Sequence, residues 1–396
     1  MSSRDLVCFS QLRWDFVYQR PHHLMRRAAR TRRVFYVEEP RLTAREPYLR
    51  ERSTPEGVEV LTPYLPRITH ESTAGPITAL LGAALRGHGV RRPVVWASTP
   101  MSQPIVAAFD AACVVYDCMD DLASFKFAPR PIRDREARLL AAADLVFTGG
   151  IGIYEAKRAL HPKVFPFPSS VDAAHFGRAR GSAPEPRDLA DIAHPRLGFV
   201  GVVDERMDMR LLAGVAAARP EWSWVIIGPV AKIPYRLLAR AANIHYLGRR
   251  DYAVLPDYLG HVDVAIMPFA INAATRYISP TKTPEYLAAG LGVVSTRIAD
   301  VVRTYGGGRA VEIADDVEGF VAACERLLGT DRAVVRAEAD WHLEGMSWDE
   351  TWRRMDGLIS QAVAARTLAS RPMTARPRRT SQEAPNAPAA AVGATS

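Results

Sequence analysis

Short runs of apolar residues alternate along this chain with longer segments in which apolar residues recur at helical spacing. The apolar runs lie at 5–10, 34–37, 93–96, 113–117, 144–148 and 164–166, and then at 196–203, 224–227, 243–247, 262–267 and 293–296. Helical periodicity is clearest at 133–143, 209–218 and 317–328. Short apolar strands separated by helices are typical of parallel sheets that helices cover on both faces. The pattern therefore predicts an α/β fold with two doubly wound, Rossmann-like domains.

A stretch rich in proline, alanine and charged residues, 178–195, separates the two sets of runs and predicts a linker. We expect an N-terminal domain at 1–177 and a second domain at 196–330, which face each other across a cleft. Ligands of doubly wound domains bind at the carboxyl ends of the strands. The candidate site is therefore expected where those edges meet.

The segment 331–365 continues with two helical patterns. The second pattern opens with Ser347 and Glu350, which have the spacing of a capping box. Three tryptophans are expected to anchor both helices on the first domain, namely Trp341, Trp348 and Trp352. From 366 to 396 the composition is mostly Ala, Pro, Arg, Ser and Thr, which predicts a disordered tail without a catalytic role.

Composition narrows the class of protein. Apolar residues make up 48% and charged residues 24% of the 396 positions, which excludes low-complexity and fully disordered chains. The four cysteines lie in apolar stretches without a Cys-x-x-Cys pair, so we expect core thiols rather than disulfides or zinc ligands. The sequence shows no signal peptide and no apolar run of about 18 residues, and we expect a cytoplasmic location. The net charge of +8 is spread along the chain apart from one cluster, and we expect no nucleic-acid partner.

The segment 279–290, Ser-Pro-Thr-Lys-Thr-Pro-Glu-Tyr-Leu-Ala-Ala-Gly, carries the most specific chemistry. Pro284 suits the first position of a helix and Gly290 suits a helix end, so a helix is predicted between them. The loop before it lies at the helix N-terminus, where free N–H groups and the helix dipole attract anions. Because this loop follows the run at 262–267, it falls at the carboxyl edge of the predicted sheet.

The side chains of this loop suit a nucleotide. The hydroxyls of Ser279 and Thr281 and the ammonium of Lys282 can bind a diphosphate, and the carboxylate of Glu285 can accept hydrogen bonds from the vicinal diol of a ribose. The alternative is a capped helix in which Glu285 only complements the helix dipole. The position of the loop after a strand of an α/β domain favours the ligand site.

Several further segments accompany this motif in a fixed order, namely 14–21, 115–121, 201–208, 248–252 and 263–268. With them, the sequence resembles bacterial glycosyltransferases of the GT-B fold and group 1 type, which act in polysaccharide and cell-envelope assembly. In that family the equivalent stretch reads Ser-Pro-x-Lys-x-x-Glu-Tyr-x-Ala-x-Gly, and its Glu binds the ribose of the donor. The resemblance covers about residues 5–360.

The chain departs from the family pattern at three positions. Tyr277 stands where the family often has a second glutamate, Ser169 stands where asparagine is frequent, and Gly292 stands where proline is usual. Of the donor-side carboxylates, the resemblance therefore assigns only Glu285.

The resemblance implies that the second domain binds a nucleoside-diphosphate sugar and that the first binds a glycan or lipid-linked acceptor, with retention of anomeric configuration. Gly201 ends the first strand of the second domain, and the loop from Gly248 is where related enzymes bind the base. Arg206 would hold the diphosphate, and a surface salt bridge to Asp204 or Asp208 is the alternative.

We expect positively charged groups to stabilise the negative charge that develops on the leaving diphosphate. Lys282, Arg206 and the helix N-terminus would all lie next to it. We therefore expect neither a metal ion nor a cofactor. No Asp-x-Asp pair is placed to bind a metal ion.

In the first domain, Gln19, Arg20 and His22 are expected at the mouth of a helix that begins at Pro21, facing the cleft on the acceptor side. For His22 the alternative is an ordinary exposed histidine. The glycine-rich turn 148–152 is interpreted as a tight connection from strand to helix rather than a dinucleotide loop.

Three carboxylates, Asp117, Asp120 and Asp121, follow the strand predicted at 113–116. Close carboxylates raise one another's pKa, which is typical of functional sites. We expect Asp120 to contact the acceptor hydroxyl or the donor sugar, with Asp117 on the acceptor side. Helix capping is the alternative for this group.

A basic cluster follows Pro21, formed by Arg26, Arg27, Arg30 and Arg33. Such a face could dock on the anionic inner surface of the cytoplasmic membrane, and a solvated face is the alternative. Two other functions remain open. One is a nucleotide-sugar epimerase of the same fold, and the other is a non-catalytic basic binding module.

Overall fold

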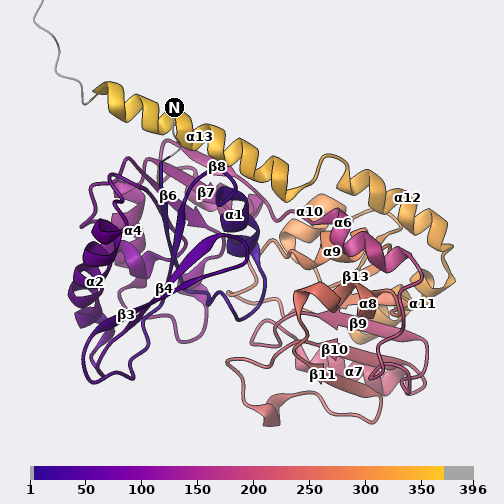
Figure 1. Ribbon diagram of the computed structural model, residues 1–396. Coiled ribbons are helices and arrows are strands. Elements are labelled where there is room, and N and C mark those ends of the chain that lie inside the picture. The colour runs from indigo at the N-terminus through magenta and orange to yellow at the C-terminus, as the bar shows by residue number, and fades with distance from the viewer. Residues whose placement is uncertain (1–3, 370–396) are drawn as a thin grey trace, which may run out of the picture.

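The computed structural model describes residues 4–369, which form two α/β domains and a long C-terminal helix that returns to the first domain (Figure 1). The chain thus crosses between the domains twice. The two sheets, their order and their connections define where a ligand can bind.

The first domain contains an eight-stranded sheet in the order β3-β4-β2-β1-β5-β6-β7-β8. Its strands are β1 (Leu6–Ser10), β2 (Val34–Glu38), β3 (Tyr48–Ser53), β4 (Val58–Tyr64), β5 (Val94–Ala97), β6 (Cys113–Cys118), β7 (Leu145–Thr148) and β8 (Val164–Pro166). Its α-helices are α1 (Arg20–Ala28), α2 (Ala74–Gly87), α3 (Gln103–Val106), α4 (Ile132–Ala142) and α5 (Ile151–Lys157). All neighbouring strands are parallel except β3 and β4, which are antiparallel.

The second domain contains a six-stranded parallel sheet in the order β11-β10-β9-β12-β13-β14. Its strands are β9 (Arg196–Val200), β10 (Ser223–Ile227), β11 (Ile244–Gly248), β12 (Val264–Met267), β13 (Val293–Ser295) and β14 (Val311–Ile313). Its α-helices are α6 (Ala173–Gly177), α7 (Met209–Ala218), α8 (Leu255–Leu259), α9 (Lys282–Ala288), α10 (Ala299–Tyr305), α11 (Val317–Gly329) and α12 (Arg332–Leu343). The order reverses between β9 and β12, and ligands of doubly wound sheets bind at such a switch point.

Every apolar run predicted as a strand forms one, and the doubly wound fold is confirmed. The hydrophobic pattern misses three strands, β3, β4 and β14. Strand β3 reads Tyr-Leu-Arg-Glu-Arg-Ser and is largely exposed at the sheet edge, so it has no buried face to give an apolar run. The signal that could have found it is Gly57, whose φ of +80° turns the chain from β3 to β4.

The first crossing between domains lies earlier than predicted. Val171 and Phe176 are each 1% exposed and pack in the core of the second domain, so 171–177 belongs to that domain. The predicted linker, 178–195, also contributes to this core through Ala179, Leu189 and Ile192. It is therefore a packed segment of the second domain rather than a loose connection.

The two C-terminal helices divide between the domains (Figure 1). Helix α12 packs on the second domain through Val335 and Ala339, whereas α13 (Trp348–Ala369) lies along the first. Trp348 and Trp352 are buried in the core of the first domain, as predicted. The prediction is wrong for Trp341, which is 69% exposed on α12.

Helix α13 begins as the capping-box spacing predicts, because the Glu350 N–H donates to Ser347 Oγ at 3.0 Å. Residues 366–369 belong to this helix and not to the predicted tail. The rest of that tail, 370–396, lies outside the described residues.

The four cysteines are buried free thiols, as predicted. In the described part of the chain, no helix is both long and apolar enough to cross a bilayer.

Candidate active site

A cavity of about 130 Å³ lies between the two domains, and we call it the crevice. The first domain lines it with residues before and at the start of α1 and after β6, and the second with residues after β9 and before α9. The crevice therefore lies at the carboxyl ends of strands from both sheets, where the predicted ligand site was expected. The predicted site residues that line it are Gln19, Arg20, Asp120, Gly201, Arg206, Ser279, Thr281 and Lys282.

The motif before α9 contributes a cation and two hydroxyls to the crevice, from Lys282, Ser279 and Thr281. The ammonium of Lys282 lies 2.7 Å from Glu285 Oε2. Glu285 is only 5% exposed and does not line the crevice itself. Its carboxylate fixes the Lys282 ammonium through their ion pair. Helix α9 begins at Lys282, which places Pro284 third in the helix rather than first. Gly290 follows the helix with φ +81°, as its predicted role as a helix end requires.

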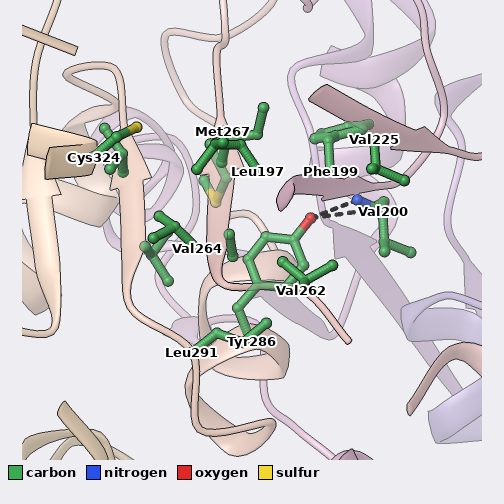
Figure 2. Close-up of a cluster of buried hydrophobic side chains, with 14 of the residues drawn as sticks. Leu197, Phe199, Val200, Val225, Val262, Val264, Met267, Tyr286, Leu291 and Cys324 are labelled. Carbon is green, nitrogen blue, oxygen red and sulfur yellow. Dashed lines mark hydrogen bonds between the residues drawn. The ribbon is translucent and has the colours of Figure 1, made fainter. Parts of the chain in front are cut away.

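Helix α9 is held in place by Tyr286, which is fully buried beneath β9 and β12 (Figure 2). The hydroxyl of Tyr286 accepts a hydrogen bond from the Val200 N–H at 2.7 Å and donates to the Val200 carbonyl at 3.3 Å. Val200 ends β9, directly before Gly201. The bond therefore fixes the helix that carries Lys282 against the loop that begins at Gly201.

The loop after β9 brings Arg206 to the crevice. Its guanidinium forms a bidentate pair with Asp204, with Nε 2.9 Å from Oδ1 and Nη2 2.8 Å from Oδ2. The salt bridge that was the alternative for Arg206 is therefore present, with Asp204, and Arg206 still lines the crevice. A Cβ at Gly201 would lie 2.9 Å from the Phe199 ring, so a larger residue there would displace this ring, and it would reach Lys282 Cε at the ordinary contact distance of 3.6 Å.

Asp120 and Asp117 differ sharply in their surroundings. Asp120 lines the crevice, and among the described residues its carboxylate accepts no hydrogen bond. Burial raises the pKa of Asp120 to about 6, although Arg206 and Arg20 favour the charged form. Asp117 is fully buried and paired with Arg20, whose Nη2 lies 2.8 Å from Asp117 Oδ1. The expectation that Asp117 faces the acceptor is therefore wrong, because Arg20 occupies its carboxylate.

His22 does not face the crevice as expected, and it is not exposed either. It is fully buried, and burial lowers the pKa of its imidazole. Its Nδ1 accepts from the Gln19 N–H at 3.1 Å, and its Nε2 lies 2.9 Å from the Trp14 carbonyl oxygen. This pair of bonds requires a neutral ring with the proton on Nε2. His22 thus shapes the loop that carries Gln19 into the crevice.

A second cavity of about 200 Å³ adjoins the crevice, with which it shares the lining residues Gly201 and Lys282, and we call it the side cavity. Residues 249–252 line it, whereas Gly248 does not. Gly248 has φ +70° and turns the chain so that the following residues reach the cavity. Gly248 therefore shapes the predicted base-binding loop but does not itself line the side cavity.

Two aromatic residues that sequence reasoning passed over join the domains at the side cavity. Tyr18 from the first domain stacks on Tyr252 from the second, with ring centroids 4.4 Å apart. Tyr252 stacks in turn on His175 at 4.2 Å. The available signal was their place in the segments 14–21 and 248–252, which follow β1 and β11.

The predicted basic face on α1 does not form. Helix α1 ends at Ala28, before Arg30 and Arg33. Arg27 is buried and pairs with Asp349 at 2.7 Å, and Arg30 pairs with the same carboxylate at 2.6 Å. The remaining two arginines are also occupied, Arg33 by Asp5 and Arg26 by the Tyr18 hydroxyl. These arginines attach α13 and the loops of the first domain, and two carboxylates, Asp349 and Asp5, balance two of the four positive charges.

The glycine-rich turn contacts the second domain. Asp300 accepts hydrogen bonds from the N–H groups of Ile151 and Gly152, both at 2.9 Å. A Cβ at Gly150 would lie 2.2 Å from Asp300 Oδ2 and 2.7 Å from Ser279 Cβ. The turn connects a strand to a helix, as predicted, and it also lets the domains approach closely. Within residues 4–369, no group of three or more His, Cys, Asp or Glu side chains could hold a metal ion.

Comparison with known proteins relates the second domain to a known family. A family model for glycosyl transferases of group 1 matches residues 194–330. The second domain is a group 1 glycosyl transferase domain. This domain carries Arg206, Lys282 and Glu285, so the resemblance read from the sequence is confirmed.

The chain is also similar to TuaH of Bacillus subtilis (strain 168), named as a teichuronic acid biosynthesis glycosyltransferase. The two are 26% identical over 259 residues, or 60% of this chain. The match spans 64% of the length of TuaH.

Solved structures that match 91% of this chain show the GT-B fold. Sucrose-phosphate synthase from Thermosynechococcus elongatus superposes with a TM-score of 0.69 at 16% identity, over 91% of this chain and 100% of that one. An α,α-trehalose-phosphate synthase (UDP-forming) from Burkholderia xenovorans, in complex with glucose-6-phosphate, gives a TM-score of 0.65 at 15% identity, over 91% and 100%. At such identities the likeness concerns the fold.

Proposed function

We propose that this protein transfers a sugar from a nucleoside-diphosphate sugar to a glycan or lipid-linked acceptor, with retention of configuration and without a metal ion. One observation carries the proposal. The cations Lys282 and Arg206, on separate loops of a group 1 glycosyl transferase domain, converge with two hydroxyls on one cavity between the domains. The UDP-forming synthase from Burkholderia xenovorans shares the fold and supports a nucleotide-linked donor.

In this proposal the second domain binds the donor. Cleavage of the bond between the anomeric carbon and the diphosphate oxygen puts negative charge on the leaving group. Lys282 and the free side of the Arg206 guanidinium stabilise that charge in the crevice between the domains. Pairing with Glu285 and Asp204 fixes the two cations before the donor arrives, so less conformational entropy is lost on binding.

The first domain presents the acceptor from the opposite wall. The acceptor oxygen forms the new bond to the anomeric carbon on the face that the diphosphate leaves, and its proton departs with the nucleoside diphosphate. Asp120 lies on this wall, where its carboxylate can accept a hydrogen bond from a sugar hydroxyl. The aromatic contact of Tyr18 with Tyr252 keeps the domains together around the reacting groups.

Thermal melting with UDP, GDP and ADP tests the donor site. The correct nucleotide raises the melting temperature, since a ligand at 100 times its dissociation constant stabilises the fold by about 2.7 kcal/mol. In Lys282→Ala the nucleotide loses a charge-assisted contact, and its affinity falls about tenfold or more. Lys163→Ala, at an exposed lysine without an ion pair in the described chain, leaves the shift unchanged. An undiminished shift in Lys282→Ala would refute the placement of the diphosphate.

A labelled donor separates transfer from epimerisation. Without an acceptor, a transferase returns the donor and a slow trace of hydrolysed sugar. Conversion of the donor into an epimer under these conditions would contradict the transferase proposal.

A further inference from the structure

The first domain contains a third cavity, of about 450 Å³, at the carboxyl ends of β1 and β2 and against the β3–β4 pair. We call it the arginine cavity. Its charged lining residues are Arg13, Arg41, Arg50, Arg52, Asp15 and Glu38. The strands β3 and β4 that form its wall are those that the hydrophobic pattern does not reveal.

The floor of the arginine cavity is a neutralised carboxylate. Glu38 is 7% exposed, and its Oε2 accepts hydrogen bonds from Arg13 Nη1 and Thr62 Oγ1, both at 2.9 Å. Its Oε1 accepts from the Trp14 N–H, also at 2.9 Å. Glu38 thus has three donors and is not available to the other arginines.

The second carboxylate is also occupied. Arg52 Nη2 lies 2.9 and 2.8 Å from the two oxygens of Asp15. Arg13 and Arg52 therefore balance the charges of Glu38 and Asp15 within the cavity. The pairing leaves the charges of Arg41 and Arg50 unbalanced.

Arg41 and Arg50 form no ion pair or side-chain hydrogen bond with any residue that the structure describes. Arg50 lies directly opposite Thr62 in the antiparallel register of β3 and β4, which places both on the cavity wall. The charged lining residues therefore give the cavity an excess of two positive charges. Two guanidinium groups that converge on a cavity without an acidic partner are typical of a site for an anion.

The arginine cavity adjoins the side cavity, which in turn adjoins the proposed reaction site. Asp15 and Phe16 line both the arginine cavity and the side cavity. The side cavity in turn shares Lys282 with the crevice. A saccharide whose reactive hydroxyl lies in the crevice can therefore extend toward Arg41 and Arg50 along the loop 14–18.

We infer that the arginine cavity binds an anionic group of the acceptor, a carboxylate or a phosphate. That the anion belongs to an acceptor rests on the proposed function, whereas binding of an anion rests on the cavity alone. The inference makes an acidic saccharide the acceptor class and makes Arg41 and Arg50 its specificity determinants. The donor sites at Lys282 and Arg206 have no part in it.

Calorimetric titration of the full chain with three sugars tests this inference. The probes are methyl glucoside, which is neutral, methyl glucuronide, which carries a carboxylate, and glucose 6-phosphate, which carries a phosphate. At least one anionic probe binds about tenfold tighter than the neutral probe, as a charge-assisted contact predicts. The tighter of the two anionic probes shows whether the natural group is a carboxylate or a phosphate.

The double variant Arg41→Gln/Arg50→Gln removes the unbalanced charge and lowers the affinity for the anionic probe about tenfold or more. Both side chains are exposed and have no ion pair within the part of the chain that the structure describes, so we expect the variant to fold. The matched control, Arg133→Gln/Arg138→Gln on α4, loses the same net charge at exposed positions and retains that affinity within about twofold.

Melting with UDP, measured on the same variants, separates this inference from the proposed function. If UDP binds while the anionic probes bind no better than methyl glucoside, or bind the Arg41→Gln/Arg50→Gln variant equally well, the inference is overturned and the proposed function stands. If the anionic probes bind through Arg41 and Arg50 while no nucleotide binds, the anion site is supported and the proposed function fails.

Discussion

At the scale of single residues, the partner of each charged group decides what that group can do. Asp117 lies near the end of β6 and Asp120 lies just after it, yet Arg20 pairs with Asp117 and no hydrogen-bond donor among the described residues pairs with Asp120. Arg206 and Lys282 each hold a carboxylate and still reach the crevice. Only groups with free hydrogen-bonding capacity can bind a ligand, so Asp120, Arg206 and Lys282 are the residues to test.

Asp120 predicts a pH dependence of transfer. Its pKa of about 6 means that the carboxylate becomes ionised, and able only to accept hydrogen bonds, as the pH rises through about 6. We expect kcat/KM to rise over that interval and then to level. Asp120→Asn abolishes this rise of kcat/KM near pH 6, which we call the acid limb of the pH profile, and lowers kcat/KM about 100-fold.

Asp121→Asn is the matched control, because Asp121 bonds the Ser124 hydroxyl and does not line the crevice. This variant keeps the limb near pH 6. Persistence of the limb in Asp120→Asn would assign the titration to another group.

At the scale of elements, the position of α9 sets the geometry of the donor site. The helix is short, from Lys282 to Ala288, and one buried hydroxyl ties it to the end of β9 (Figure 2). Helix α13 is held by other contacts. Trp348 and Trp352 are buried in the first domain. Asp349 forms ion pairs with Arg27 and Arg30. Each element thus depends on a few contacts that are distant in the sequence.

Tyr286→Phe tests the tie between α9 and β9. The substitution leaves the Val200 N–H buried without its acceptor, which costs about 1–3 kcal/mol of stability. Because α9 is no longer fixed against the Gly201 loop, the affinity for the nucleotide also falls. Thermal melting measured with and without UDP reports both effects.

Tyr246→Phe separates stability from positioning. Tyr246 donates a hydrogen bond to the Ala239 carbonyl at 3.0 Å in the same domain and lines neither the crevice nor the side cavity. Its loss lowers the melting temperature but leaves nucleotide affinity unchanged. Equal loss of affinity in both variants would show that Tyr286 acts only through stability.

At the scale of the whole molecule, close contacts between the domains define the crevice. Asp300 of the second domain accepts two backbone hydrogen bonds from the start of α5, and Tyr18 stacks on Tyr252. The Lys126 N–H donates to Glu205 Oε1 at 3.1 Å, which adds a third contact across the same boundary. The crevice walls come from both domains, so ligand binding depends on this closed arrangement.

Gly150→Ala places a methyl group between the domains. The added Cβ would overlap Ser279 and Asp300, so the closed arrangement becomes less populated. We expect a larger radius of gyration in small-angle scattering and an affinity for UDP that falls about in proportion to the closed fraction. Gly177→Ala, whose Cβ meets no atom within 4 Å, changes neither quantity. An unchanged radius of gyration and an unchanged UDP affinity in Gly150→Ala would show that the domains accommodate the methyl group without separating.

The sequence by itself determined the doubly wound fold, the buried strands, the helix that begins near Lys282 and the loop that carries the candidate diphosphate site. These features follow from the spacing of apolar residues and from helix start and stop signals, which are local along the chain. The hydrophobic pattern did not predict strand β3, because an exposed edge strand has no buried face and therefore no apolar run.

Only the tertiary structure decided which charges are free. Arg20 meets Asp117 across 97 positions of sequence, and Arg27 meets Asp349 across 322. Such distant pairs place Asp117 and Arg27 in structural contacts, whereas Arg41 and Arg50 have no ion pair among the residues that the structure describes. The spacing of residues fixes local conformation, but the pairing of charges depends on which surfaces the folded chain brings within a few ångströms.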